Sequence, residues 1–229
     1  MALKMYDLCG KDKSRRFSPF CWRIKMALAH KGLETEFIPW RFTEKETISQ
    51  TNQGLVPVLV DGDRWLHDSW NIALYLDQQY PQKPLMGGEQ AKALTQFARY
   101  WVDSQLSGII LKLVVNDIPG KLDAEDAEYF ITSREQRFGQ SLEAFAGDSE
   151  KNLKQLHATL LPARLTLKKQ LFLCGDHPAY ADYILFSVFQ WARSVSTTPL
   201  LDDPQDSLYL WRERMLDLYD GLARRAPAA

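Results

Sequence analysis

The first residues that could do chemistry form the segment Ser18-Pro19-Phe20-Cys21-Trp22-Arg23, between a predicted strand and a predicted helix. Ser18 suits the N-cap of that helix and Pro19 its first position, where a missing N–H costs nothing. A helix start also has free N–H groups and the positive end of the helix dipole, so it favours an anion such as the thiolate of a bound small thiol. Ser18 would then donate its hydroxyl proton to the sulfur. Simple capping and thiolate binding both stay open here.

Two further positions could recognise a peptide-like ligand. Val56-Pro57 opens a predicted hairpin, and a cis bond there would leave the main chain of Val56 free to pair with a ligand; the isomer stays open, since trans is the default. Asp68-Ser69 precedes the next predicted helix. Ser69 could cap that helix or hold a carboxylate at its N-terminus, and Asp68 could accept hydrogen bonds from an ammonium group. These two residues together suit an α-amino acid end.

These residues need a scaffold in which short strands alternate with helices. Phe20, Ile24, Ala27 and Leu28 share one face of the helix that follows Ser18. The other expected elements of this part are strands at 3–8 and 33–40, a helical segment at 43–50, hairpin strands at 56–60 and 64–67, and a helix over 69–80.

After Gly87-Gly88, where we expect a domain boundary, apolar residues recur with the period of helices. Pro162 should kink the third of these helices, and the tail Arg224–Ala229 is expected to be disordered. The expected buried faces run through Ala91, Leu94, Ala98 and Trp101, then through 127–142, 153–171, 181–192 and 208–222.

Composition excludes several classes of function. The 28 Lys and Arg against 29 Asp and Glu give a net charge of -1, without the basic excess of a nucleic-acid binder. No apolar run of membrane-spanning length and no signal peptide is recognisable, so we expect a cytoplasmic protein with no membrane partner. Cys9, Cys21 and Cys174 show no C-x-x-C or zinc spacing, and the four histidines no ligand spacing. We therefore expect a reducing compartment and no metal site.

Together, the three segments resemble the glutathione transferase family, over almost the whole chain. The resemblance implies an α/β thioredoxin-like N-terminal domain of β-α-β-α-β-β-α order at residues 1–86, which binds glutathione. It also implies an all-α C-terminal helical bundle at residues 92–229, which holds the electrophile pocket.

The resemblance also implies the roles of single residues. Ser18 would hydrogen-bond the glutathione sulfur, Val56 before a cis Pro57 would pair with the cysteinyl main chain, and Asp68 and Ser69 would hold the γ-glutamyl end.

Other site residues are expected from position alone. Arg41 could reach the glycyl carboxylate of glutathione and Gln53 could contact the bound peptide, although a surface role is as well supported for both. The electrophile pocket should draw on the loop before Ser18 and on the first long helices of the second domain. The candidates, for most of which a core position is the alternative, are Tyr100, Trp101, Gln105, Ile109 and Lys112.

A narrower resemblance is to a serine-type group that includes bacterial β-etherases and fungal FuA-like transferases. It is carried by Ser18-Pro19-x-x-Trp22-Arg23, Pro39-Trp40-Arg41-Phe42, Asp68-Ser69-Trp70 and Ala179-Tyr180-Ala181-Asp182-Tyr183. In the lignin ether-cleaving members, the glutathione thiolate attacks the carbon that bears an aryl ether oxygen and expels a phenolate. The chain departs from family patterns at Ala179, where a capping-box Ser or Thr is common. It departs from the disulfide-exchanging relatives at Ser18, which replaces their reactive Cys.

The expected function is therefore that of a cytoplasmic, homodimeric detoxification-type glutathione transferase. Its co-substrate would be glutathione and its acceptor a hydrophobic, aromatic electrophile. A non-catalytic glutathione-binding or scaffolding module is one alternative. A glutathione-dependent disulfide reductase is another, disfavoured because Ser18 is not a Cys and because Cys21, on the apolar side of its helix, should be buried and inert.

Overall fold

The N-terminal domain is built around β1 (Leu3–Leu8), whose residues alternate between buried and more exposed positions over most of its length. β1 pairs in parallel with β2 (Thr35–Trp40) and antiparallel with β3 (Val58–Asp61), and β3 pairs antiparallel with β4 (Arg64–His67). In this computed structural model, which describes residues 3–229, the strand order is thus β2-β1-β3-β4.

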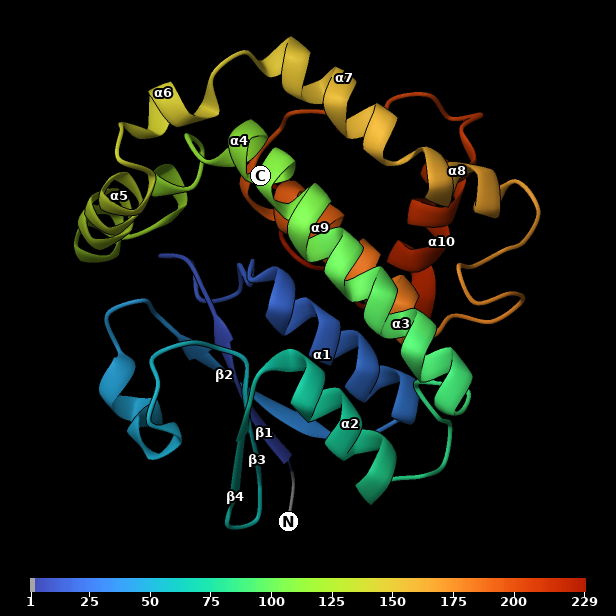
Figure 1. The fold of residues 1–229 in the computed structure, drawn as a ribbon. Coiled ribbons are helices and arrows are strands. Elements are labelled where there is room, and N and C mark those ends of the chain that lie inside the picture. Colours follow the sequence, from blue (N-terminus) through green and yellow to red (C-terminus); the bar gives the residue numbers. More distant parts are fainter. Residues whose placement is uncertain (1–2) are drawn as a thin grey trace.

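Three helical segments complete this domain: α1 (Pro19–Lys31), the 3₁₀ segment η1 (Lys45–Thr51) and α2 (Ser69–Gln79). The order β-α-β-α-β-β-α is therefore confirmed. Helices α1 and α2 lie between the sheet and the second domain (Figure 1). Gly32 ends α1 in a left-handed conformation with φ 69°, which glycine adopts without a steric penalty, and this lets the chain turn back into β2.

The second domain is entirely helical, as predicted. Pro162 lies in the first turn of α8, so the chain there is broken into two helices instead of one kinked helix. In order, its elements are α3 (Glu89–Trp101), the π-helical turn η2 (Val102–Leu106), α4 (Ser107–Val114), the 3₁₀ turn η3 (Pro119–Lys121), α5 (Ala124–Phe138), α6 (Leu142–Ala146), α7 (Ser149–Thr159), α8 (Leu161–Leu167), α9 (Tyr180–Val195) and α10 (Ser207–Gly221).

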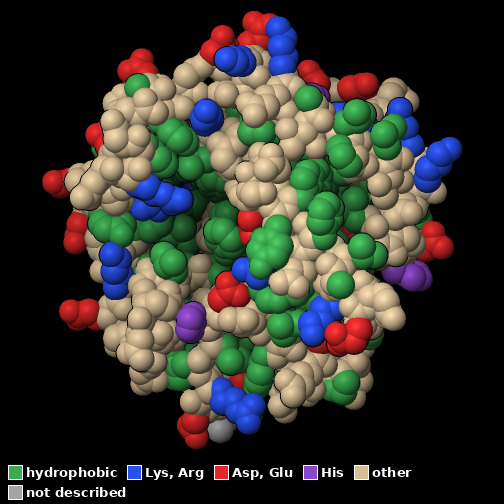
Figure 2. Space-filling view, in the orientation of Figure 1, with side chains coloured by type: hydrophobic (Ala, Val, Ile, Leu, Met, Phe, Trp, Pro, Cys, Tyr) green, Lys and Arg blue, Asp and Glu red, His purple; other side chains and the backbone are tan. Residues whose placement is uncertain are grey.

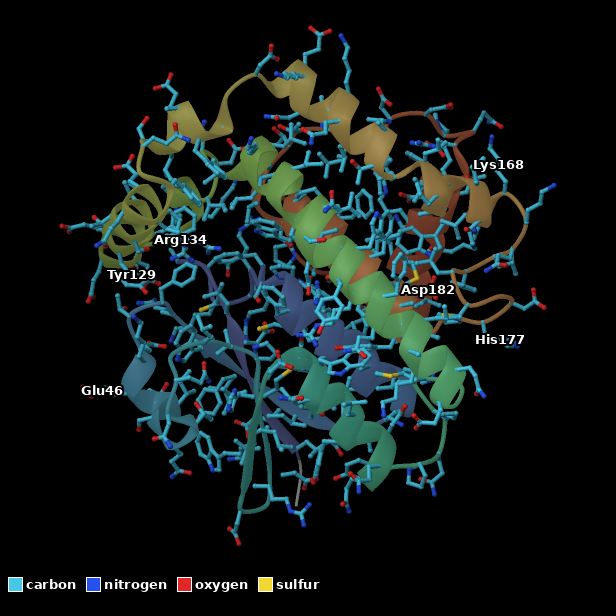
Figure 3. The ribbon with its side chains drawn as sticks, in the orientation of Figure 1. Glu46, Tyr129, Arg134, Lys168, His177 and Asp182 are labelled. Carbon is cyan, nitrogen blue, oxygen red and sulfur yellow. The ribbon has the colours of Figure 1, made fainter. Side chains whose placement is uncertain are left out.

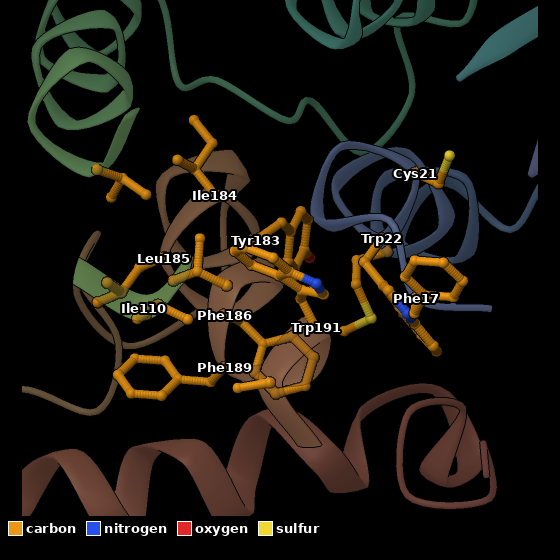
Figure 4. Close-up of a cluster of buried hydrophobic side chains, with 14 of the residues drawn as sticks. Phe17, Cys21, Trp22, Ile110, Tyr183, Ile184, Leu185, Phe186, Phe189 and Trp191 are labelled. Carbon is orange, nitrogen blue, oxygen red and sulfur yellow. The ribbon is translucent and has the colours of Figure 1, made fainter. Parts of the chain in front are cut away.

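The two domains share one hydrophobic core in which α1 packs against α9. Trp22 of α1 and Tyr183 and Phe186 of α9 are fully buried, and they lie together with Phe17 and Cys21 in the cluster of Figure 4. Burial of each such side chain contributes about 1.5–3 kcal/mol to the stability of the folded protein. The helix that carries Ser18 at its start is thus fixed from both domains.

Two expectations about the helical domain are wrong. Leu94 does not lie on a buried face of α3: it is 72% exposed, next to Phe97 at 73%, so this side of the helix faces away from the core. The C-terminal tail is ordered, since Arg224 pairs with Glu213 and the N–H of Ala229 donates to the carbonyl of Arg193 at 2.9 Å.

Within residues 3–229, none of the helices is both long enough and apolar enough to cross a bilayer.

Candidate active site

Ser18 stands at the start of α1, at the end of the loop that follows β1. Its carbonyl accepts from Trp22 N at 3.0 Å and its Oγ accepts from Cys21 N at 3.3 Å, so it is the N-cap that the sequence predicts, with Pro19 next to it. The indole N–H of Trp22 donates to the carbonyl of Arg16 at 2.8 Å and fixes the preceding loop. A hydroxyl that accepts one bond can still donate its own proton, and the contact of Ser18 with a ligand sulfur stays a prediction.

Cys21, one turn into α1, is fully buried. Burial raises the pKa of its thiol well above the ordinary value, and the nearby Asp7 carboxylate raises it further. Asp7 is itself buried and paired with Lys25 at 3.0 Å. Cys21 is therefore a buried thiol with low reactivity, as expected.

The Val56–Pro57 peptide bond is cis. It lies just before β3, whose pairing with β1 ends at Val58, so the main chain of Val56 is beyond the ladder. Gln53 holds the preceding turn: its Oε1 accepts from Leu55 N at 2.6 Å and its Nε2 donates to Leu55 O at 2.9 Å. Both ends of the Gln53 amide are thus used within its own loop, and its contact with a bound peptide stays a prediction.

Asp68, not Ser69, is the N-cap of α2. Asp68 has a φ of 67° and its Oδ1 accepts from Trp70 N and Asn71 N, each at 3.0 Å. Ser69 is the first residue of the helix, is 4% exposed, and its carbonyl accepts from Tyr180 of α9 at 2.8 Å. The start of α2 is thereby held against the helical domain, with the second carboxylate oxygen of Asp68 left for other partners.

A network of charges across the domain interface was not predicted. Arg99 of α3 lies 3.4 Å from Asp68 Oδ2 and 3.6 Å from Asp103 Oδ2. Asp103, in the π-helical turn η2, also pairs at 2.5 Å with Arg23, a guanidinium that is 1% exposed. The i, i+4 spacing of Arg99 and Asp103 is a sequence signal for their pairing, whereas their contacts with Asp68 and Arg23 depend on the tertiary fold.

Arg41, at the end of β2, pairs with Asp123 next to α5 at 2.8 Å. Its Nε is buried and makes no hydrogen bond within residues 3–229. The ion pair with Asp123 holds Arg41 in place, and a contact with the glycyl carboxylate stays a prediction.

The five predicted pocket residues lie in three kinds of environment. Tyr100 is 56% exposed on the same outer side of α3 as Leu94 and Phe97. Ile109 is a core residue, while Gln105 is exposed and hydrogen-bonds Ser104. Trp101 is half-buried, and Lys112 is exposed with its ammonium over the Phe145 ring at 5.7 Å.

Figure 2 shows a hollow with hydrophobic walls at the place where Figure 1 draws the first turn of α1, between α5 and α3. The α5 side of this region is an aromatic cluster that was not predicted. The Phe42 ring lies 6.1 Å from that of Phe17, 6.0 Å from that of Tyr129 and 5.9 Å from that of Phe130. Phe17 directly precedes Ser18, so these rings form a continuous apolar wall from the start of α1 to α5.

A separate cavity of about 300 Å³ lies between α9, α10 and the segment 196–200, lined by Arg193, Arg212 and Glu213 among others. It includes none of the predicted site residues. Among residues 3–229 no cluster of His, Cys, Asp and Glu suited to a metal ion is found.

Two family models match the chain: the glutathione S-transferase N-terminal domain over residues 14–84 and its C-terminal domain over residues 93–199. Glutathione S-transferase Z1 of Arabidopsis thaliana is 41% identical over 86 residues, 34% of this chain and 39% of that protein. The first curated relatives are matched over only about 39% to 56% of their length.

Solved structures agree in fold. A glutathione S-transferase of Ceriporiopsis subvermispora, solved in complex with glutathione, is 20% identical with a TM-score of 0.84 and full coverage of both chains. Glutathione transferase GSTFuA3 of Phanerochaete chrysosporium is 24% identical with a TM-score of 0.78, over 96% of this chain and 92% of that one. With both family domains in the expected order on the expected fold, the chain belongs to the glutathione S-transferase family.

Proposed function

We propose that this protein is a glutathione transferase that stabilises the thiolate of bound glutathione for attack on an aromatic electrophile. The observation that carries the proposal is the placement of Ser18. Its hydroxyl caps α1 and could still donate its own proton to a ligand, and the hollow of Figure 2 lies where Figure 1 draws the first turn of α1. The acceptor would enter over the apolar wall around Phe42, with aryl ether cleavage as one possible use of the site.

The energetics of this arrangement are sufficient. Lowering a thiol pKa from about 8.5 by two units takes about 2.7 kcal/mol. A hydrogen bond to a charged group contributes about 1.5–3 kcal/mol, and the N-terminal end of a helix adds about 0.3–1 kcal/mol. Holding both reactants in position supplies further rate enhancement without a covalent enzyme intermediate.

The rest of glutathione would bind along the edge of the N-terminal domain. The main chain of Val56, before Pro57, would pair with the cysteinyl unit like an added strand. Asp68 would accept from the α-ammonium group, and Ser69 and the N–H groups of α2 would hold the α-carboxylate.

At the other end of the tripeptide, Arg41, whose side chain is 32% exposed beside Asp123, would hold the glycyl carboxylate. A contact from Gln53 would require its present bonds within the loop to open.

Disulfide reduction has weaker support. It needs a reactive thiol beside the glutathione sulfur, but the position at the helix start is Ser18 and the neighbouring Cys21 is fully buried. All three cysteines are unpaired, which supports a reducing, cytoplasmic location.

The test is Ser18→Ala, followed by ultraviolet titration of the bound thiolate and by steady-state turnover. The pKa of bound glutathione should rise by about 1–2 units, and turnover near pH 7 should fall about 10- to 100-fold, since one charge-assisted hydrogen bond is lost. Glutathione affinity should change far less.

Ser141→Ala is the matched control, because Ser141 caps α6 in the same way, accepting from Ala144 N at 3.1 Å. It should leave the thiol pKa unchanged. Unchanged turnover in Ser18→Ala would remove the role given to Ser18, and no turnover by the unaltered protein over a panel of aryl halides and aryl ethers would favour the binding module.

A homodimer is the second part of the proposal. One side of α3 exposes an apolar strip formed by Leu94, Phe97 and Tyr100. Monomeric proteins rarely expose contiguous apolar patches of this kind. Phe97→Glu should convert the dimer into a monomer in light-scattering mass measurements. A monomeric mass for the unaltered protein at working concentration would contradict the proposal.

A further inference from the structure

We propose that the acceptor is an aromatic electrophile that carries a carboxylate, and that Arg134 of α5 binds this group. The inference rests on the proposed transferase function and names the chemical class of its second substrate.

Arg134 lies on the side of α5 that faces the sheet domain (Figure 3). Its guanidinium carbon is 5.2 Å from the centre of the Phe42 ring and 4.7 Å from that of Phe130. It therefore lies against the aromatic wall.

The charge of Arg134 has no counterion in the part of the chain described, residues 3–229. Its one hydrogen bond of standard geometry there runs from Nη1 to Ser133 Oγ at 2.9 Å, and no carboxylate lies within 4 Å of its nitrogens. Arg164, also half-buried in this domain, pairs with Asp206 at 2.9 Å, whereas Arg193 and Arg214 donate to backbone carbonyls and, like Arg134, form no ion pair within residues 3–229. A guanidinium has five N–H donors in a planar fork that matches a carboxylate, so most of the binding capacity of Arg134 is unused.

The surroundings of Arg134 reduce its contact with water. Burial lowers the pKa of this guanidinium, with an opposing contribution from Tyr129, so the cation is held where its charge is poorly solvated. Lys45 adds a second positive charge, its ammonium 4.6 Å from the Tyr129 ring centre. The acidic residues Glu125 and Glu128 line a groove with Tyr129, Thr132 and Gln136 that does not include Arg134. A ligand carboxylate would supply the missing charge.

The positions of Ser18 and Arg134 fit one substrate. The Phe42 ring contacts both Arg134 and Phe17, the residue before Ser18. An aromatic ring lying on Phe42 would direct its reacting carbon toward the sulfur at Ser18 and its carboxylate toward Arg134. A purely structural Arg134, which only stacks on Phe42 and Phe130, would stabilise the fold but would not distinguish charged from neutral acceptors.

The test compares 4-chloro-3-nitrobenzoate with 4-chloro-3-nitrobenzamide. In both, the glutathione sulfur bonds to the ring carbon that carries chlorine, chloride leaves with its electron pair, and the thiol proton passes to the buffer. Each rate is divided by the uncatalysed rate with glutathione. We expect this rate enhancement to be about 10- to 100-fold larger for the benzoate than for the benzamide, which is the range that one hydrogen-bonded charged pair contributes. Arg134→Met should lose this preference.

Arg137→Met is the matched control, because it removes the same charge from an exposed position on the same helix. It should keep the preference. Arg134→Lys keeps the charge without the planar fork and should retain part of the preference, which covers the case in which Arg134→Met does not fold.

Binding of the two finished conjugates, S-(4-carboxy-2-nitrophenyl)glutathione and its carboxamide, is measured by calorimetry as a readout independent of turnover. Tighter binding of the carboxylate that is lost in Arg134→Met supports the inference. Equal affinities in the unaltered protein overturn it, whether or not turnover occurs. Turnover of both acceptors with equal enhancement also overturns it and leaves the transferase function standing, whereas preferential binding without any turnover overturns the transferase function alone.

Discussion

Replacing Asp103 with Asn should destabilise the protein substantially, although Asp103 is not a core residue. Its carboxylate is the counterion of Arg23, whose guanidinium is 1% exposed and also donates to Ser187 Oγ at 3.3 Å. Asn keeps the size and one carbonyl acceptor but removes the charge. The change therefore isolates the electrostatic part of the contact.

The expected magnitude follows from burial. Removing one partner of a buried ion pair costs about 3–5 kcal/mol, because the other charge stays uncompensated. The Asp103 side chain is 27% exposed, and Ser187 still accepts one hydrogen bond from Arg23 in the variant. We therefore expect Asp103→Asn to lower the free energy of unfolding by about 2–3 kcal/mol. For a chain of this length, that corresponds to a fall of about 5–10 °C in the melting temperature.

Guanidinium denaturation followed by the fluorescence of the seven tryptophans measures this change. Arg23→Met should restore part of the stability in the Asp103→Asn background, because the uncompensated cation is then absent. Glu150→Gln, which breaks the exposed pair with Lys154 in α7, is the control and should leave the midpoint nearly unchanged. Equal stability of Asp103→Asn and the unaltered protein, or a double variant no more stable than Asp103→Asn, would refute the reasoning.

Two further perturbations follow from the same structure. Asp182→Asn should lower the free energy of unfolding by about 1–3 kcal/mol. Oδ2 of Asp182 accepts from Ala179 N at 3.1 Å, and an amide nitrogen in its place would leave the Ala179 N–H without an acceptor. Burial raises the pKa of Asp182 to about 6. Between about pH 4 and pH 6 the carboxyl of Asp182 is protonated in the folded protein but ionised in the unfolded chain. Its contribution to the free energy of unfolding therefore falls as pH rises through this range and is constant above about pH 6. Denaturation midpoints over this range should lose that slope in Asp182→Asn, and a persistent slope would point to another group. Arg99→Gln removes the partly exposed ion pair that holds Asp68 in position, so the Kd of glutathione should rise about two- to fivefold. The kcat at saturating glutathione should be unchanged. A lower kcat with an unchanged Kd would argue against this positioning role.

Local rules were enough to predict the start of α1. Ser18 and Pro19 satisfy the capping preferences on their own, and the structure confirms them. At α2 the same rules pointed to Ser69 as the cap, whereas the structure has Asp68 in that position. The choice depends on the turn from β4, which places Asp68 at a φ of 67°, and on Tyr180, which holds the Ser69 carbonyl. Neither is visible in a short stretch of sequence.

The remaining misses have a common physical cause, which is contact between distant segments. The helical period of α3 was predicted, but which neighbour covers each side is decided elsewhere, so Leu94 was placed in the core. Arg134 and Phe42 are 92 positions apart, and no spacing rule connects them. The tail that contains Arg224 looks polar and small in isolation, yet it finds partners on α10.

The attachment of α5 has a consequence for how new specificities could arise. Its main neighbours within the helical domain are η3 and α6, which adjoin it in sequence, and it is tied to the sheet domain through Phe42 and through Thr43, whose N–H donates to Asp126 at 3.1 Å. The exposed positions of segment 119–146 can therefore be diversified as a cassette, whereas Leu122, Phe130, Leu142 and Ala146 belong to the core that α1 and α9 share and would be kept. Libraries confined to that cassette would vary the choice of acceptor while the glutathione half of the enzyme stays constant.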